Sequence, residues 1–126
     1  MRAKWLVVGG IVLGAGAFAA LPDASAEENL DPVKVCPDTH KTIFENSFVR
    51  VIEAKVPPGG REAKHRHPKG LTVYLADYSI EQKTFPDGKV SPGDRKFGTV
   101  NWSDGVIHEV KNTGKTASHA IRIELK

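Results

Sequence analysis

Turn-forming sequences recur roughly every ten residues along residues 37–126, and this spacing constrains the fold more than any other feature. Residues 57–60 read Pro-Pro-Gly-Gly, residues 86–88 read Pro-Asp-Gly and residues 112–115 read Asn-Thr-Gly-Lys. The runs between such turns are short, apolar and rich in β-branched residues, and they lack the three- and four-residue apolar spacing of an amphipathic helix. The pattern predicts an all-β domain, either an antiparallel double-sheet jelly roll or a closed barrel.

The apolar runs define the expected strands, and no helix is expected after residue 26. A long strand is expected at 71–80, and a hairpin turn at 86–88 joins the segment 80–85 to the chain from residue 89. Trp102 is expected to pack in the core. Residues 27–36 carry little pattern and are predicted to be an N-terminal arm or an edge strand. The other strands are expected at 48–56, 97–102, 107–110 and 119–125.

The first 26 residues have the organisation of a secretory signal peptide. Arg2 and Lys4 precede an apolar run over residues 6–20, and Ala24-Ser25-Ala26 supplies a small-residue cleavage site. The apolar run is short for a membrane span. We therefore expect a periplasmic or secreted protein of about 100 residues, with one domain over 37–126. An uncleaved N-terminal anchor is the alternative.

Charge and cysteine content exclude several classes of protein. The formal net charge of +3 comes from scattered residues, with no basic cluster interleaved with aromatic side chains. This excludes nucleic-acid binding, and it excludes membrane-surface binding once the signal peptide is removed. Cys36 is the single cysteine, so no internal disulfide can form. We expect it to be a small buried residue at the start of the first strand; a disulfide between two chains is the alternative.

Histidines form the main candidate site. In an extended segment, residues two apart point to the same face, so His65 and His67 can converge on one ion. Imidazole is a usual ligand of zinc, iron, nickel and copper, and His108 follows about forty residues later. His119 shares a strand face with three aliphatic residues; it is a fourth nitrogen if that face points inward, and a residue of the barrel wall otherwise. His40 is expected at the surface.

The spacing around these histidines resembles the cupin superfamily. Gly59-x5-His65-x-His67 resembles the first half of the first cupin motif, and Gly105-x2-His108-x3-Asn112 resembles the second half of the second. Phe44-Glu45-Asn46 and Phe48-Val49-Arg50-Val51 are similar to a group of small exported cupins without a settled function. The resemblance runs from about Val33 to the C-terminus. It implies a small β-barrel in which His65, His67 and His108 hold one divalent metal, and it implies a homodimer.

The sequence also departs from the cupin pattern. The family's first motif ends in a glutamate that completes the metal site, whereas Leu71 and Thr72 occupy those positions here. Three imidazoles with water still suit iron, zinc, copper or nickel, but they suit magnesium and calcium poorly. The residues expected to line a pocket for a small-molecule ligand are Thr72, Tyr74, Tyr78 and His119.

Three classes of function remain open at this point. The protein could be a metal-dependent oxidase, lyase or isomerase acting on a small molecule. It could instead be a metal-free small-ligand-binding or degenerate cupin without catalysis. A structural role, in which barrels pair through edge strands, is the third. The missing glutamate favours the second and third classes, while the retention of all three histidines speaks against the third.

Overall fold

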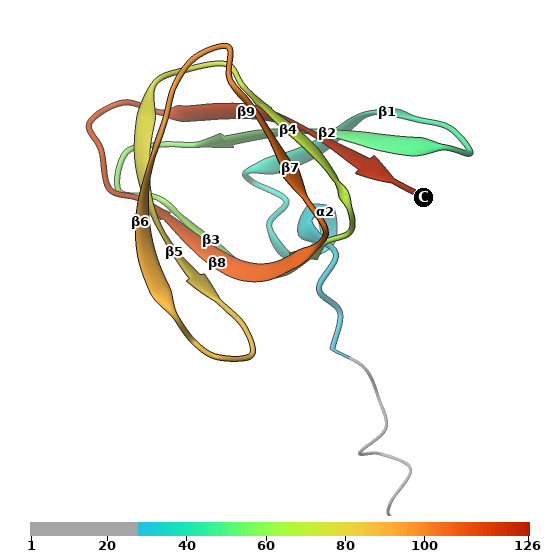
Figure 1. Ribbon diagram of the computed structural model, residues 1–126, viewed down its shortest axis with the longest axis horizontal. Helices are drawn as coiled ribbons and strands as arrows, with labels where there is room; N and C mark the ends of the chain where they lie inside the picture. The colour runs from blue at the N-terminus through green and yellow to red at the C-terminus, as the bar shows by residue number, and fades with distance from the viewer. Residues whose placement is uncertain (1–27) are drawn as a thin grey trace, which may run out of the picture.

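The computed structural model describes residues 28–126, which form two antiparallel sheets that face each other (Figure 1). Side chains from both sheets line one cavity between them. The five-stranded sheet has the order β1 (His40–Glu45), β2 (Val49–Val56), β9 (Ser118–Leu125), β4 (Gly70–Tyr74) and β7 (Val100–Ser103). The four-stranded sheet has the order β3 (Arg61–His67), β8 (Val106–Asn112), β5 (Tyr78–Thr84) and β6 (Val90–Arg95). The predicted all-β double-sheet fold is confirmed. The predicted signal peptide lies outside the described residues.

The expected single strand over 71–80 is wrong, because the chain crosses from one sheet to the other within it. Tyr74 ends β4 in the five-stranded sheet, and Tyr78 begins β5 in the four-stranded sheet. Asp77 holds the crossing: its Oδ1 accepts a hydrogen bond from the Phe97 N–H at 2.8 Å, and its carbonyl accepts one from Thr116 Oγ1 at 3.0 Å. The two tyrosine rings still meet, with centroids 6.0 Å apart.

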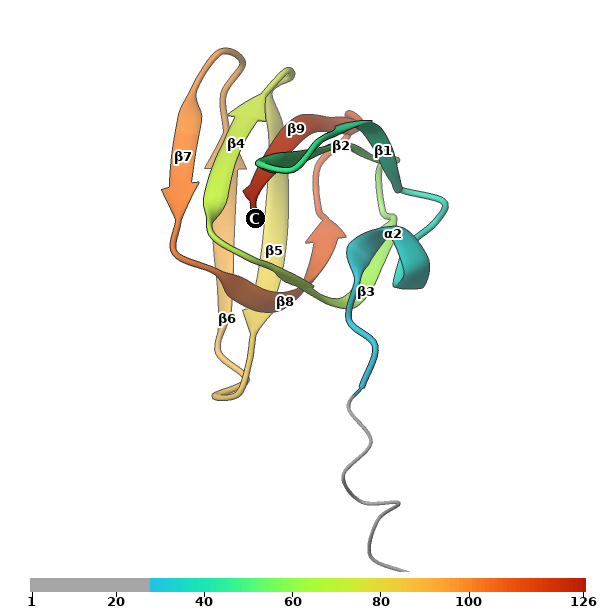
Figure 2. The same ribbon diagram turned by 90° about the vertical axis from the view of Figure 1, so that its right-hand side faces the viewer.

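A short helix, α2 (Pro32–Val35), occupies the segment predicted as an arm or an edge strand. Asp31 caps it, since its side chain accepts a hydrogen bond from the Val33 N–H, and proline at the first helical position has no N–H to lose. Just before it, the Leu30 carbonyl accepts a hydrogen bond from the Arg66 N–H at 2.8 Å. The segment therefore covers the free edge of β3, beside which α2 lies (Figure 2).

A β-bulge in β3 determines which of its side chains face the cavity. Glu62 pairs with Val110 and His65 pairs with His108, so β3 contains one residue more than β8 between these pairs. Residues three apart in a regular strand point to opposite faces. The bulge instead turns Glu62, His65 and His67 to the same side, where all three are buried.

The inward face of the five-stranded sheet mixes apolar and charged residues. Ile52 and Val56 on β2 are buried there, whereas β9 buries Arg122 and Glu124 at positions that alternate with the more accessible Ile121, Ile123 and Leu125. Trp102, expected in the core, is half exposed on the outer face, because register places it beside Leu71. No helix within residues 28–126 is long and apolar enough to cross a membrane.

Candidate metal centre

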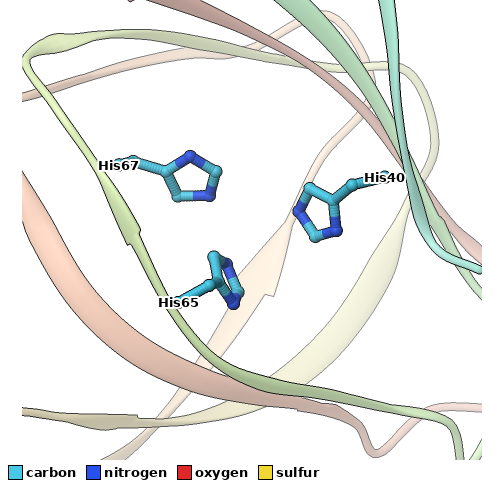
Figure 3. A group of neighbouring side chains, drawn as sticks. All are labelled: His40, His65 and His67. Atoms are coloured by element: carbon cyan, nitrogen blue, oxygen red, sulfur yellow. The ribbon is translucent and has the colours of Figure 1, made fainter. Parts of the chain in front are cut away.

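Four imidazoles converge inside the barrel. His65 and His67 extend from β3, and His40 reaches toward them from β1 in the opposite sheet (Figure 3). One ligand nitrogen from each of these three residues lies within 4.8 Å of the others. His108 joins from β8, directly opposite His65 in register, and the Nε2 atoms of that pair are 3.1 Å apart. The three predicted histidines therefore lie together. The fourth imidazole beside them is that of His40, which the sequence predicts at the surface.

Hydrogen bonds fix which ring nitrogen of each predicted ligand is free. His65 Nδ1 is 2.7 Å from the Ala63 carbonyl oxygen, and His108 Nδ1 is 3.2 Å from Gln82 Oε1. His67 Nδ1 is 2.8 Å from Glu124 Oε2. All three partners are acceptors, so each Nδ1 carries the proton and each Nε2 keeps a lone pair. Metal-binding histidines in proteins usually show this arrangement, with the second nitrogen held by a carbonyl or carboxylate.

The prediction that His40 lies at the surface is wrong: it is 4% exposed. The strand begins at His40 itself, and pairing with Ala54 turns its side chain into the cavity. Its Nδ1 is 3.0 Å from Thr39 Oγ1, and its Nε2 is 3.3 Å from Glu62 Oε2. Burial raises the pKa of Glu62 to about 7, so near neutrality this carboxyl is partly protonated beside an imidazole that stays neutral.

A carboxylate network supports the cluster from the other side. Glu124 accepts a hydrogen bond from His67 through Oε2, and through Oε1 it accepts two from Arg50, at 2.9 Å from Nε and 2.8 Å from Nη2. Arg50 also donates to Asp31 at 3.1 Å, next to α2. His67 is therefore held in one tautomer by a buried carboxylate whose charge Arg50 balances.

Burial keeps the imidazoles neutral, which is the state that binds a metal. Desolvation, reinforced by the neighbouring histidines, lowers the pKa of His40 to about 3 and those of His67 and His108 to about 2. Desolvation also lowers the pKa of His65. At neutral pH the cluster therefore presents lone pairs rather than positive charges.

Cys36 lies beside the cluster but is a poor ligand. It is buried, as predicted, although it ends α2 instead of starting a strand. Its Sγ is 3.8 Å from His65 Nδ1, the nitrogen that faces away from the other imidazole, and 3.5 Å from the Ala63 carbonyl oxygen. Burial raises the pKa of the thiol to about 11, so the thiolate needed for metal binding is scarce at neutral pH.

A cavity of about 210 Å³ opens next to the histidines. Three of the four predicted pocket residues, Thr72, Tyr74 and Tyr78, line it together with His67 and His108. His119 does not, because its strand face points outward; its Nε2 lies 2.9 Å from Glu53 Oε2 on the outer surface. The fourth imidazole near the site is His40 instead.

Thr72 lies where the cupin motif would place its glutamate, and an arginine faces it. Thr72 is paired in register with Arg122, whose Nη1 donates a hydrogen bond to Thr72 Oγ1 at 3.2 Å. No carboxylate enters the site from β4. The carboxylates near the histidines come from Glu62 on β3 and Glu124 on β9, at the ring nitrogens described above.

Comparison with known proteins supports the fold alone. No protein-family model and no curated protein matches the sequence. A solved cupin domain from Bordetella pertussis Tohama I is similar over 80% of this chain and 99% of its own, with 24% identity and a TM-score of 0.64. An uncharacterised protein with a double-stranded β-helix domain from Klebsiella pneumoniae is 18% identical over 83% of this chain and 85% of its own, with a TM-score of 0.56. An RmlC-like cupin family protein from Methanocaldococcus jannaschii is 12% identical over 68% of this chain and 77% of its own, also with a TM-score of 0.56. The protein described here therefore has the cupin fold, with a cluster of buried histidines inside its barrel.

Proposed function

We propose that this protein binds one divalent transition metal through Nε2 of His65, His67 and His108, and that the cavity beside the metal receives a small molecule. His40 is placed as a fourth nitrogen next to this group. Three imidazoles select iron, zinc, copper or nickel over magnesium and calcium, which prefer oxygen ligands. The metal would supply Lewis-acid or redox chemistry, and an oxidase, lyase or isomerase reaction is the class proposed.

The contact between His65 and His108 carries this proposal. Both Nδ1 atoms are protonated toward acceptor oxygens, so the two Nε2 atoms face each other at 3.1 Å with a lone pair each. Two acceptors at this distance repel each other, and neither ring is protonated near neutral pH. A cation bound by both nitrogens removes the repulsion. Around a tetrahedral zinc with bonds of about 2.0–2.1 Å, ligand nitrogens are separated by roughly 3.3 Å.

Metal content measured on an exported, untagged protein tests the proposal. The full chain is expressed with its own N-terminal region and purified from the periplasm, and metals are quantified by mass spectrometry. We expect about one equivalent of metal in the wild type, a loss in His108→Ala and His67→Ala, and no change in the matched control His119→Gln. Metal that survives His108→Ala would contradict the site. A wild type that stays metal-free after reconstitution would favour a ligand-binding pocket without metal.

The same preparation tests the proposed export. An N-terminal Arg2 and Lys4, an apolar run and Ala24-Ser25-Ala26 support removal of residues 1–26. We expect the intact mass of the periplasmic protein to correspond to a chain that starts at Glu27. A full-length mass, or a protein confined to the cytoplasm, would contradict it.

We also propose a homodimer formed through the outer face of the five-stranded sheet. One apolar row crosses all five strands there, since register places side by side Phe44, Val51, Ile123, Leu71 and Trp102. Phe44 is 54% exposed and Trp102 is 49% exposed. A continuous exposed apolar row of this kind is typical of an interaction surface, and the cupin resemblance implies a second copy of the chain as the partner.

A further inference from the structure

Arg122 is a buried cation that points into the cavity. It lies on the inward face of β9, is 5% exposed and lines the pocket together with His67 and His108. A charged side chain this deep in a protein normally has a counter-charge.

The hydrogen bonds of Arg122 leave much of its guanidinium unused. Nη1 donates to Thr72 Oγ1 at 3.2 Å, and Nη2 donates to the Pro68 carbonyl. Both acceptors are neutral. Nε is buried and has no hydrogen-bond partner within residues 28–126. A guanidinium has five N–H groups arranged to match a carboxylate with two parallel hydrogen bonds, so a neutral hydroxyl and a carbonyl leave this capacity unmet.

The acids near the cavity are already engaged. Glu124 accepts hydrogen bonds from Arg50 and His67, and Glu62 contacts His40. Burial favours the neutral form of Glu62, because it raises its pKa to about 7. Across the described part of the chain, no carboxylate lies within ion-pair distance of the Arg122 guanidinium.

A second arginine adds to the positive charge of the cavity. Arg95 on β6 lines the pocket, and its guanidinium lies over the Tyr74 ring at 5.3 Å from the centroid. Within residues 28–126 it, too, forms no ion pair with a carboxylate. A divalent metal held by the imidazoles would add its charge to that of the two arginines. The polar groups around this space include those of Thr72, Tyr78, Asn101 and Ser103.

We infer that the ligand of this cavity is a small organic carboxylate, and that Arg122 binds its carboxylate group beside the metal. The part of this inference that puts the ligand beside a metal rests on the proposed function. The part that assigns the carboxylate to Arg122 does not depend on a bound metal. A cavity of about 210 Å³ suits a small organic acid. The cupin motif would place a glutamate at the position of Thr72, opposite Arg122. Because threonine carries no charge, we infer that the ligand supplies the negative charge that pairs with Arg122.

Binding of matched acids and amides tests the inference. Acetate, glycolate and lactate are titrated by calorimetry into zinc-loaded and metal-free protein, alongside acetamide, glycolamide and lactamide. We expect at least one acid to bind at least tenfold more tightly than its amide. Arg122→Gln should weaken that acid at least tenfold, whereas the matched control Arg66→Gln, on the exposed side of β3, should not change it. Arg122→Lys should retain part of the affinity, because it keeps the charge but not the paired hydrogen bonds.

Thr72→Glu provides a test that does not remove the arginine. Register places the new carboxylate opposite Arg122 on the inward face, so it should pair with the guanidinium, raise the melting temperature and abolish binding of the acids. Acids and amides that bind alike, or acid binding unaffected by both Arg122→Gln and Thr72→Glu, would overturn the inference. Acid binding that persists in a protein unable to take up zinc would refute the metal proposal and leave this inference standing. A protein that takes up zinc but binds acids and amides alike would support the metal proposal and refute this inference.

Discussion

Two glutamate–histidine pairs, whose glutamates lie on the neighbouring strands β9 and β2 of the five-stranded sheet, show how differently the two faces of that sheet are built. Glu124 and His67 meet at 2.8 Å inside the barrel, where the exposed fractions of the two side chains are 4% and 8%. Glu53 and His119 meet at 2.9 Å on the outer face, where the corresponding fractions are 29% and 31%. The distances are nearly equal, and each glutamate has a second cationic partner, Arg50 for Glu124 and Lys55 for Glu53, but only the inner pair is desolvated. Burial, rather than contact distance, should therefore decide what each pair contributes to stability.

The rest of the sheet follows the same division. Its inward side carries His40, Arg50, Thr72, Arg122 and Glu124, whereas its outward side carries the apolar row that includes Ile123 and Trp102. A sheet that only had to fold would bury the second set. The polar side chains of the inward face support the proposed metal and ligand site.

Glu124→Gln should have the largest effect on stability. It removes a buried negative charge that balances Arg50 and orients His67. Breaking a buried ion pair by removing one partner costs about 3–5 kcal/mol, so we expect a loss of roughly 3 kcal/mol in the free energy of unfolding, measured by urea denaturation. Because Arg50 retains its ion pair with Asp31 in this variant, the loss of stability should fall at the lower end of that range. A loss below about 1 kcal/mol would mean that this network is not a main support of the barrel.

Acid should destabilise the metal-free protein by a smaller amount. The folded-state pKa values of His40, His67 and His108 lie at about 2–3, below the value of about 6.5 in an unfolded chain. The unfolded state thus binds more protons below pH 6.5, so the stability that these groups contribute is present above that pH and is lost as pH falls. Glu62 acts in the opposite direction, because its raised pKa favours the folded state as pH falls from about 7 toward 4.5. Three histidines outweigh one carboxyl, and we expect a net loss of roughly 2 kcal/mol between pH 7 and 5.5.

Denaturation curves of the metal-free protein at several pH values check this prediction. A matched series on His119→Gln should show the same dependence of the free energy of unfolding on pH, since His119 lies on the outer face of the sheet. Stability that stays constant or rises toward pH 5.5 would show that the interior histidines are already protonated in the folded state.

Trp102→Ser should act on association more than on folding. Trp102 ends the apolar row on edge strand β7 and is half exposed, so its removal costs the folded monomer little. Aromatic side chains often dominate interface energies. We expect the proposed dimer to dissociate at least tenfold more readily, as measured by light scattering across a dilution series. A wild type that is monomeric at high concentration would contradict the dimer itself.

Glu53→Gln should have the smallest effect, although it is the same chemical change as Glu124→Gln. The His119 hydrogen bond lowers the pKa of Glu53, but solvent screens the pair. We expect an unchanged melting temperature and unchanged metal content. A shift as large as that of Glu124→Gln would remove the distinction between the two faces.

The sequence predicted the strand pattern and the convergence of His65, His67 and His108, because both depend on local spacing. It did not predict the burial of His40 or the carboxylate partner of His67, since these depend on long-range register between β1, β2 and β9. The alternation of polar and aliphatic residues along β9 is visible in the sequence, but the aliphatic residues Ile121, Ile123 and Leu125 are the ones usually expected to face the interior. The polar alternate positions, Arg122 and Glu124, were the overlooked signal.

The bulge in β3 has a consequence for how the site could change during evolution. It is a single extra residue between Glu62 and His65, so deleting Ala63 or Lys64 would leave a regular ladder in which Glu62 still pairs with Val110 and His65 with His108. Residues two apart in a regular strand share a face, so Glu62 would stay on the side of the histidines. Such a deletion would instead change the local backbone that carries the Ala63 carbonyl, the acceptor that fixes the tautomer of His65.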